Sequence, residues 1–320
     1  MRKAALLYNP ASGGNHSKRQ TELESALQIL RGAGVDAELI PTASRTDVAA
    51  QTQNAIAQGC DTIFACGGDG TIHDIVQVLA GSRVALAILP MGTANTLAHD
   101  LRLPLHPLAA TKTALESKAR RIALGHIKYS DLQSKPATRY FVVAAGAGVD
   151  AHLFHRLRSS TKQRLGMGAY YLKAWQLWLS HIMIRFLIDY AESGSDQPQQ
   201  ANVTELLAVR IRNFGGVLQE LAPGASLDRD DLRLVFAPTA SRLAYLLYVI
   251  RGMLHQRWPI PGIKLAHSTK VCFRYLPVTS STGETEVQPP VYLEADGELL
   301  GTLPAEITIV RDALTMLSPV

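Results

Sequence analysis

Short apolar runs alternate with helical patterns over the first 125 residues of the chain. In the helical stretches, apolar side chains recur every three or four residues and so share one face. We predict strands at Ala4–Tyr8, Ala37–Ile40, Thr62–Cys66 and Val84–Leu89, and helices at Lys18–Arg31, at Asp47–Gln58, over Ile72–Leu79 and after Asn95. Strands that alternate with helices through short turns predict a parallel sheet covered on both faces.

From about residue 126 the pattern changes to strands joined by longer loops. We predict strands at Phe141–Ala145, Leu206–Ile211, Leu232–Phe236, Lys270–Tyr275, Val291–Ala295 and Ala305–Val310. Helical insertions are predicted at Lys162–His181 and Ser241–Gln256, and the polar stretch Glu192–Ala201 is interpreted as a surface loop. This part favours an α+β or β-sandwich region. The expected domains are residues 1–125 and 126–320, and the last strands are free to return to the first domain.

Composition excludes some classes of protein. The chain of 320 residues is 47% hydrophobic and 18% charged, which is ordinary for a globular protein. Its formal net charge of +5 indicates an anionic partner, and nucleotides, anionic lipids and nucleic acids all qualify. Three cysteines without metal-ligand spacing favour reduced thiols, and the first apolar run ends at Tyr8, too early for a secretory signal. A cytoplasmic protein is therefore expected.

The longest apolar region, Gly166 to Tyr190, does not predict a transmembrane helix. Lys173, His181 and Arg185 interrupt it, and charges near the middle of a span are costly. Any membrane contact is therefore expected to be peripheral.

The segment Gly67-Gly68-Asp69-Gly70-Thr71 joins an apolar strand to a helix. Unpaired N–H groups and the helix dipole favour a phosphate at such a helix start, and glycines let the backbone approach it closely. Asp69 places a carboxylate where magnesium could bridge phosphates. The structural alternative is a tight turn with a solvated Asp69.

Two further loops follow predicted strands, namely Gly92-Thr93-Ala94-Asn95 and the loop from Asn9 to Gly14. Thr93 could simply cap the following helix. Ligands of open α/β sheets bind at the carboxyl ends of the strands, where all three loops are expected. The sequence therefore predicts a nucleotide site at this edge of the sheet.

At this point the chain resembles a known family, the bacterial diacylglycerol kinase-like lipid kinases, whose catalytic domain is shared with diacylglycerol, sphingosine and ceramide kinases. The resemblance runs through nearly the whole chain and is carried by Asn9–Gly13, Gly67–Thr71, Leu89–Asn95, Gly146–Ala151, Gly166 with Tyr170–Leu172, Asn213–Gly216, Pro223–Ala225 and Asp296–Glu298. The Gly-Asp-Gly motif occurs also in NAD kinases and phosphofructokinases. Its combination with the Gly-Thr-Ala-Asn loop and the late Asp-Gly-Glu is specific.

The resemblance implies a three-layer α/β nucleotide-binding domain, a C-terminal β-sandwich domain and an active site in the cleft between them, with ATP and Mg²⁺ as cofactors. It assigns ATP contacts to Asn9, Thr42, Gly67, Gly68, Gly70, Thr71, His73, Asp74, Gly92, Thr93 and Asn95. For His73, a position on the helix surface is favoured over a nucleotide contact.

The resemblance also assigns the acidic residues. Asp69 would organise the catalytic magnesium, Glu298 would be the general base, and Asp296 would belong to the same acidic network. A carboxylate that accepts the proton of a lipid hydroxyl contributes about 10²–10⁴-fold to the rate. The nearest match to a second, structural magnesium site consists of the carbonyls of Leu227 and Leu232 with Asp230.

The chain departs from the family pattern at three places. Thr96 stands where an aspartate is usual, Ala123 stands at an acidic position of a linker strand, and Arg229-Asp230-Asp231 replaces the usual Asp-Gly of the structural metal site. Asp230 alone could bind a metal weakly, or Arg229 could replace the ion.

Two segments combine basic and aromatic residues, as interfacial helices do. The first runs from His155 to Trp178 and the second is Leu243–Trp258, with Tyr245 and Tyr248. The alternative is that these aromatics pack the core of the second domain.

The sequence therefore predicts a lipid kinase that transfers a phosphoryl group from ATP to a lipid hydroxyl at the membrane surface. The alternatives are an NAD kinase-type enzyme with a soluble substrate and a catalytically weak homologue that binds nucleotide or lipid. The identity of the lipid stays open, no nucleic-acid partner is expected, and a homodimer is left open.

Overall fold

The computed structural model describes residues 1–10, 16–148, 183–195, 197–216, 220–277 and 289–319. Contacts group the chain into two compact units. Unit 1 comprises Met1–Leu124, Ile211–Gln219 and Val310–Val320, and unit 2 comprises Gly125–Arg210 and Glu220–Ile309. The division into domains at residue 125 stays a prediction.

The sheet of unit 1 is parallel, and its strand order is β2-β1-β3-β4-β15. Its strands are β1 (Lys3–Tyr8), β2 (Asp36–Pro41), β3 (Thr62–Gly67), β4 (Ala85–Pro90) and the end of β15 (Glu298–Ser318). Each of the first four confirms a strand predicted from an apolar run. The last was predicted only as far as Val310, and it pairs with β4 through Thr315 and Met316.

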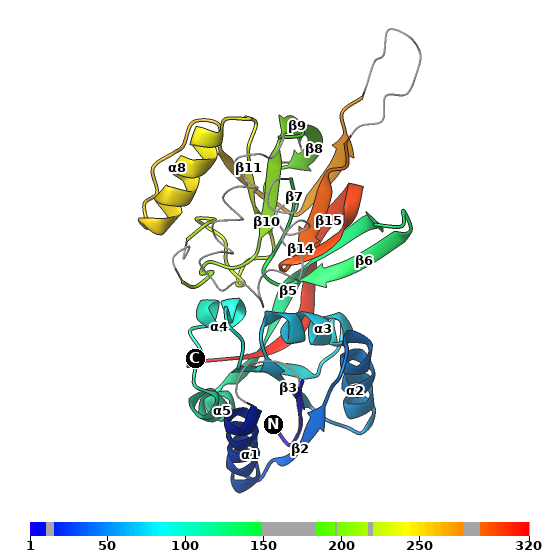
Figure 1. The fold of residues 1–320 in the computed structure, drawn as a ribbon, viewed down its shortest axis with the longest axis vertical. Coiled ribbons are helices and arrows are strands. Elements are labelled where there is room, and N and C mark those ends of the chain that lie inside the picture. The colour runs from blue at the N-terminus through cyan, green and yellow to red at the C-terminus, as the bar shows by residue number, and fades with distance from the viewer. Residues whose placement is uncertain (11–15, 149–182, 196, 217–219, 278–288, 320) are drawn as a thin grey trace. The chain divides into compact units, whose positions relative to one another are not determined.

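Helices cover both faces of this sheet (Figure 1). They are α1 (His16–Gly32), α2 (Arg45–Ala57), α3 (Asp69–Leu79), α4 (Thr96–Asp100) and α5 (Pro107–Glu116). Helix α1 packs on α5 and β2, whereas α2 packs on α3 and β1. On the α1 side, Leu23 and Leu30 bury their side chains against Leu6 and Phe64 of the sheet. The predicted three-layer α/β arrangement is therefore confirmed.

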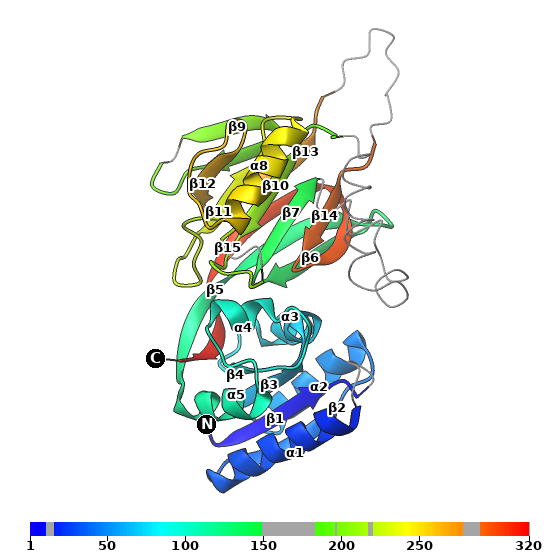
Figure 2. The ribbon, with the colours of Figure 1, turned by 60° about the vertical axis from the view of Figure 1, so that its left-hand side comes forward.

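Unit 2 is built mainly from antiparallel strands (Figure 2). They are β6 (Pro136–Phe141), β7 (Ala144–Gly148), β8 (Phe186–Ala191), β9 (Pro198–Val203), β10 (Glu205–Val209), β11 (Leu232–Phe236), β12 (Lys264–Ser268), β13 (Lys270–Tyr275) and β14 (Tyr292–Ala295). One branch runs β12-β11-β10-β7-β14-β15 and the other β15-β13-β8-β9, while β5 (Lys118–Asp131) pairs with β6 and β15.

The two branches of unit 2 face each other across one apolar core. Tyr190 of β8 and Phe236 of β11 lie in different branches, and their ring centroids are 5.3 Å apart. Both belong to a cluster that gathers buried side chains from β5 to β15. The β-rich second part that the sequence predicted is confirmed, and its two faces enclose the core as in a sandwich.

Two predictions in unit 2 were wrong in detail. The strand predicted at Phe141–Ala145 is interrupted by a bend between the end of β6 and the start of β7. The N–H groups at this bend donate to the carboxylate of Asp296. The loop predicted at Glu192–Ala201 ends at residue 197, since Pro198 begins β9 and lies opposite Ala191 of β8. An edge strand of this kind tolerates polar residues on its exposed side.

Helix α8 (Arg242–Met253) confirms the helical insertion predicted at Ser241–Gln256. The other insertion, Lys162–His181, lies outside the described residues. Across the described helices, none has the length and apolarity needed to span a bilayer.

Candidate functional site

The loop Gly67–Thr71 turns directly from β3 into α3. Gly68 is the N-cap of α3, and no side chain caps this helix start. A Cβ on Gly67 would lie 2.4 Å from Oγ1 of Thr71, whereas one on Gly70 would meet nothing within 4 Å. The first turn of α3 therefore presents backbone N–H groups and the positive end of its dipole beside open space. That geometry suits an anion.

The loops after β3 and β4 touch through their glycines. The two strands are parallel neighbours, with Gly67 opposite Pro90. A Cβ on Gly92 would lie 2.4 Å from the Cα of Gly68, so only glycine permits this approach. The register of β3 and β4 thus brings together the two glycine loops that the sequence singled out.

Asn95 closes the second loop. Its backbone is left-handed (φ 49°), its Oδ1 accepts the N–H of Gly92 at 2.9 Å, and its Nδ2 donates to the carbonyl of Gly92 at 3.0 Å. Thr93 is exposed and is not the helix cap that the sequence allowed, because Asn95 occupies the N-cap position of α4.

Asp69 links the two loops. Its Oδ1 accepts the N–H of Thr96 at 2.8 Å, and its Oδ2 lies 3.5 Å from the hydroxyl of Thr96. Asp69 therefore satisfies the first turn of α4 in place of a cap from that helix itself. Thr96 stands where the family pattern has an aspartate. It donates to the carboxylate of Asp69, whereas an aspartate side chain at this position would repel that carboxylate.

The residues of this loop fit a magnesium ion carried by a nucleotide. A carboxylate has about four acceptor positions, and Asp69 uses two of them on Thr96. Within the described part of the chain, no three His, Cys, Asp or Glu side chains gather into a metal-binding group. Magnesium usually binds through one or two carboxylates together with phosphates and water. Asp69 is therefore a fitting ligand for phosphate-bound magnesium, directly or through water.

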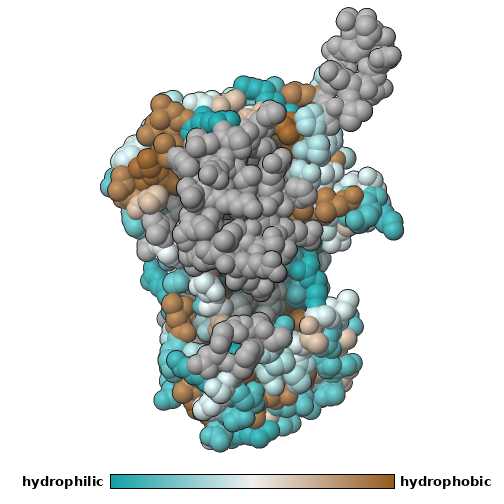
Figure 3. Space-filling model, viewed as in Figure 1, coloured by the Kyte–Doolittle hydropathy of each residue, from teal (hydrophilic) through white to brown (hydrophobic). Residues whose placement is uncertain are grey.

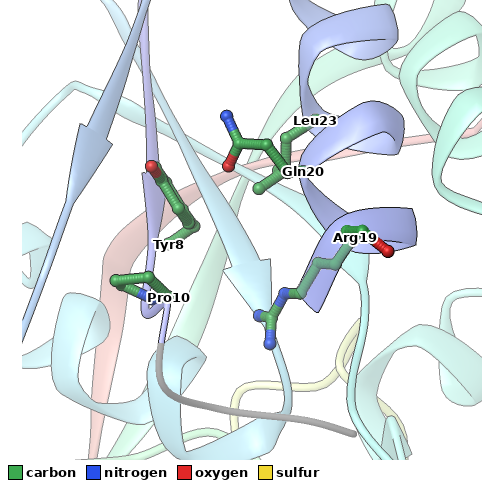
Figure 4. Close-up of a pocket in the computed structure, with 6 residues that line it drawn as sticks. Tyr8, Pro10, Arg19, Gln20 and Leu23 are labelled. Atoms are coloured by element: carbon green, nitrogen blue, oxygen red, sulfur yellow. The ribbon is translucent and has the colours of Figure 1, made fainter. Parts of the chain in front are cut away.

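A pocket of about 280 Å³ lies beside the end of β1, next to Asn9 (Figure 4). It is lined by Tyr8, Pro10, Ser17, Arg19, Gln20 and Leu23. The Nη2 of Arg19 donates to the carbonyl of Cys66 at 3.1 Å, and burial lowers the pKa of this guanidinium. The sequence analysis missed Arg19. The sequence signal that could have identified Arg19 is a basic residue in the first helix, shortly after the loop that begins at Asn9.

Thr42 is buried and contacts Tyr8, one of the residues that line the pocket. Its N–H and its hydroxyl both donate to the carbonyl of Tyr8, at 2.8 and 3.1 Å. Thr42 therefore holds the end of β1, and its predicted contact with ATP stays a prediction. Of the first loop, Asn9 and Pro10 are described, and 11–15 lie outside the described residues.

His73 and Asp74 are on α3 below the glycine loop. His73 is 2% exposed, so the expectation of a surface position was wrong: it lies among Ile72, Ile75 and the other buried residues of the helix. Asp74 forms an ion pair with Nε of Arg45 at 3.0 Å, which joins α3 to α2.

In unit 2, Asp296 and Gly297 form the turn between β14 and β15. Both residues have left-handed backbones (φ 50° and 78°), as tight hairpins require. The carboxylate of Asp296 accepts three N–H groups, from Val142 at 3.0 Å, from Val143 at 2.8 Å and from Ala144 at 3.0 Å. Asp296 therefore anchors the bend between β6 and β7.

Glu298 opens β15, at the strand end where the sequence placed it. Its Oε2 pairs with Nη2 of Arg139 on β6 at 2.8 Å, and both side chains are largely buried. The sequence analysis did not identify Arg139, because the pairing joins positions far apart in the chain.

The residues matched to a second metal site have the following surroundings, and their assignment to a metal stays a prediction. The carbonyl of Leu227 faces the guanidinium of Arg210 at 3.5 Å, Leu232 lies within β11 opposite Ser268, and Asp230 is exposed. Ala123, where the family pattern has an acid, is a buried residue of β5.

Solved structures share this architecture. A diacylglycerol kinase from Bacillus anthracis superposes with a TM-score of 0.67 at 16% identity, covering 99% of this chain and 96% of its own. Yeast NADH kinase in complex with NADH superposes with a TM-score of 0.50 at 11% identity, covering 100% and 84%. These superpositions show that the fold is shared with both enzymes.

Sequence comparison shows a more specific similarity, to diacylglycerol kinases. Residues 3–127 match the diacylglycerol kinase catalytic domain. The diacylglycerol kinase of Staphylococcus saprophyticus is 26% identical over 322 residues, covering 99% of this chain and 96% of that protein. The diacylglycerol kinase of Bacillus subtilis is 28% identical over 309 residues, covering 96% and 93%. Residues 3–127 thus resemble the catalytic domain of a kinase, and the chain as a whole is similar to diacylglycerol kinases.

Proposed function

We propose that this protein transfers the γ-phosphoryl group of ATP, with Mg²⁺, to the hydroxyl of a diacylglycerol-like lipid at a membrane surface. The observation that carries the proposal is the contact between the Gly68 and Gly92 loops at the end of two parallel strands, within the region that matches the kinase domain. Together with Asp69 at the start of α3, these loops offer N–H groups for phosphates and a carboxylate for magnesium.

The chemistry needs positioning and charge neutralisation more than covalent catalysis. Bound Mg²⁺ would neutralise charge on the phosphates. In this assignment Asp69 orients the ion, the N–H groups of the first turn of α3 hold the phosphates, and Glu298 accepts the proton of the lipid hydroxyl. Arg139 holds the carboxylate of Glu298, and at least one acceptor position of that carboxylate must be free to receive the proton of the lipid hydroxyl.

A second candidate function is a binding protein with weak or no catalysis. It is favoured by the partners of the three carboxylates: Asp69 is engaged by Thr96, Asp296 by three backbone N–H groups and Glu298 by Arg139. In that case the acidic residues would be structural, and the loops would bind nucleotide without turnover.

Phosphoryl transfer from labelled ATP separates these candidates. The assay uses diacylglycerol in mixed micelles, with NAD as the soluble acceptor and with no acceptor as the blank. We expect transfer to the lipid, and a loss of about 10²–10⁴-fold in kcat for Glu298→Gln with ATP affinity unchanged. Equal, near-zero rates for the wild type and Glu298→Gln would favour the binding protein, and transfer to NAD alone would favour the soluble-substrate enzyme.

Helix α8 supports a membrane-surface substrate. Leu243, Leu247, Ile250 and Leu254 are spaced by three or four residues and are 63%, 39%, 37% and 57% exposed, so that they form one apolar stripe. Figure 3 shows this apolar surface over α8. No Asp or Glu occurs between residues 232 and 283, which suits a bilayer with anionic headgroups.

The tyrosines of α8 do not belong to this stripe. Tyr248 is buried and donates to the carbonyl of Leu221, while the hydroxyl of Tyr245 lies 2.7 Å from that of Thr204. Tyr248 is therefore an interior residue, as the alternative expectation has it, whereas Tyr245 is half-buried. Trp258, five residues beyond the end of the helix, is 44% exposed.

Vesicle flotation tests this surface. We expect the protein to float with vesicles that contain phosphatidylglycerol and to lose most of this binding in Leu247→Gln/Leu254→Gln, while turnover of a short-chain, water-soluble diacylglycerol is retained. Leu132→Gln, which changes an exposed leucine outside α8, is the matched control. Unchanged flotation of the double variant would exclude α8 as the contact without affecting the proposed chemistry.

A further inference from the structure

Arg210 is a fully buried cation at the point where the chain leaves unit 2. It directly follows β10, and Ile211 begins the segment that belongs to unit 1. Its side chain is among the largest that are entirely buried, and its N–H donates to the carbonyl of Val143 at 2.8 Å. A charge in such a position is costly unless nearby groups satisfy it.

Alternate carbonyls of the segment Leu227–Asp231 supply those partners. Nη1 of Arg210 donates to the carbonyl of Arg229 at 2.7 Å and to that of Asp231, and Nη2 faces the carbonyl of Leu227 at 3.5 Å. The segment therefore curls around the guanidinium with every second carbonyl turned inward. Carbonyl oxygens arranged in this way are also ligands that hard metal ions prefer.

The charges around the segment match a single internal cation. Asp228, Asp230 and Asp231 all favour the protonated guanidinium. Burial lowers the pKa of Arg210 to about 10, which leaves it charged near neutral pH. The carboxylate of Asp231 is held by Nε of Arg229 at 2.8 Å and by Nδ1 of His267 at 3.2 Å.

We propose that the guanidinium of Arg210 is a built-in cation that takes the place of a metal ion in the segment Leu227–Asp231. A magnesium ion needs its ligands at about 2.0–2.1 Å, and the carbonyl of Leu227 already faces Arg210. A second cation beside a buried guanidinium would also be repelled. This part of the fold is therefore independent of Mg²⁺, whether or not the protein transfers phosphate with it.

This inference corrects the expected role of two residues. The cation comes from Arg210 on β10 and not from Arg229, whose guanidinium binds Asp231 instead. Asp230, offered as the remaining carboxylate ligand, is exposed, and its negative charge favours the protonated form of Arg210.

The first test uses the wild-type protein without nucleotide. Thermal unfolding is followed by tryptophan fluorescence in EDTA and in Mg²⁺ or Ca²⁺, and Asp230→Asn is measured in parallel. All tryptophans of the chain lie in unit 2 by sequence, so the signal reports on that unit. We expect the same midpoint with chelator and with metal. A midpoint that falls in EDTA, with a response that disappears in Asp230→Asn, would overturn the proposal.

The second test removes the cation. We expect Arg210→Ala to lower the midpoint and to recover part of the loss with guanidinium at about 10 mM, far below denaturing concentrations. Arg251→Ala is the matched control, because Arg251 is equally buried but its guanidinium stacks over the ring of Tyr248 at 4.2 Å. Recovery of both variants to the same extent would overturn the proposal. If Arg210→Ala does not fold, Arg210→Lys and the wild-type measurement still decide it.

Discussion

The two units of this protein hold their polar groups in opposite ways. In unit 1, the glycine loops meet backbone to backbone, and the first turn of α3 presents N–H groups beside the open space at Gly70. In unit 2, charged side chains have partners within the unit. Arg210 donates hydrogen bonds to carbonyls, Asp296 accepts them from N–H groups, and Glu298 forms an ion pair with Arg139. The difference teaches that close backbone contacts between glycines leave N–H groups open at a helix start, whereas the buried charges of unit 2 already have partners within the unit.

The largest expected effect is on the internal charges of unit 2. Asp296→Ala leaves three N–H groups without their acceptor, and we expect a loss of about 3 kcal/mol in the free energy of unfolding, measured by urea denaturation. Asp296→Asn retains one acceptor oxygen and suits the left-handed backbone, so about half of this loss is expected. Equal stability of the alanine variant and the wild type would show that Asp296 is not structural.

The glycine contact in unit 1 comes next. Gly92→Ala puts a Cβ 2.4 Å from the Cα of Gly68, and we expect a loss of about 2 kcal/mol from overpacking, together with loss of ATP binding. Gly70→Ala is the control for stability, since its Cβ meets nothing within 4 Å, and a gain of about 0.5–1 kcal/mol is expected in a helix. Calorimetry and equilibrium unfolding measure both. Equal destabilisation by the two substitutions would contradict the close approach.

A smaller effect is expected at the link between the loops. Asp69→Ala removes the acceptor for the N–H of Thr96, and we expect a loss of about 1 kcal/mol, typical of a lost helix cap. Thr96→Val removes only a hydroxyl that lies 3.5 Å from the carboxylate, so its stability should stay close to that of the wild type. Hydrogen exchange of the amides of α4 locates the change, and protection that is the same in both variants would refute the cap.

The smallest expected effect is the change of folding stability with pH, which arises from two residues of unit 2. Burial lowers the pKa of His267; the pKa of Asp231 is lowered by its hydrogen bond from Arg229 and by nearby positive charge, although burial opposes this. Both groups bind fewer protons when folded than when unfolded, so acid destabilises the fold. We expect losses below about 1 kcal/mol for each, first below about pH 6.5 for His267 and then below about pH 3.9 for Asp231.

Tryptophan fluorescence measures this slope during acid titration, and His267→Asn should remove the upper part of it. A stability that rises as the pH falls from about 6.5 to about 5 would contradict the lowered pKa of His267, because the folded state would then bind the extra proton.

The sequence predicted the strands of unit 1 well because parallel strands buried on both faces are continuous apolar runs. It missed β6, β9 and β12, whose polar residues hide the pattern: β9, for example, is mostly exposed. It also missed β8, whose apolar residues continue the long apolar region that begins at Gly166. The glycine loops were predicted because they are local in sequence. The partners of Asp296 and Glu298 were not, because hydrogen bonds to residues more than 150 positions away leave no local pattern.

The sequence around Arg210 carries a signal for a buried cation that was not used in the sequence-based predictions. It stands between Val209 and Ile211 in an otherwise apolar stretch, and a cation there indicates either an exposed strand end or an internal partner. Which carbonyls it binds depends on the path of the segment Leu227–Asp231, and that path is set by packing and not by residue type.

The end of β15 has a consequence for biosynthesis. Leu314 and Met316 are fully buried in unit 1, the carbonyl of Ala313 accepts the N–H of Gly81, and Thr315 lies beside Ala85 of β4. A nascent chain therefore exposes this flank of β4 until Thr315 and Met316 have been translated and can pair with it. During that interval β4 presents an unpaired strand edge, the kind of surface through which incompletely synthesised chains associate.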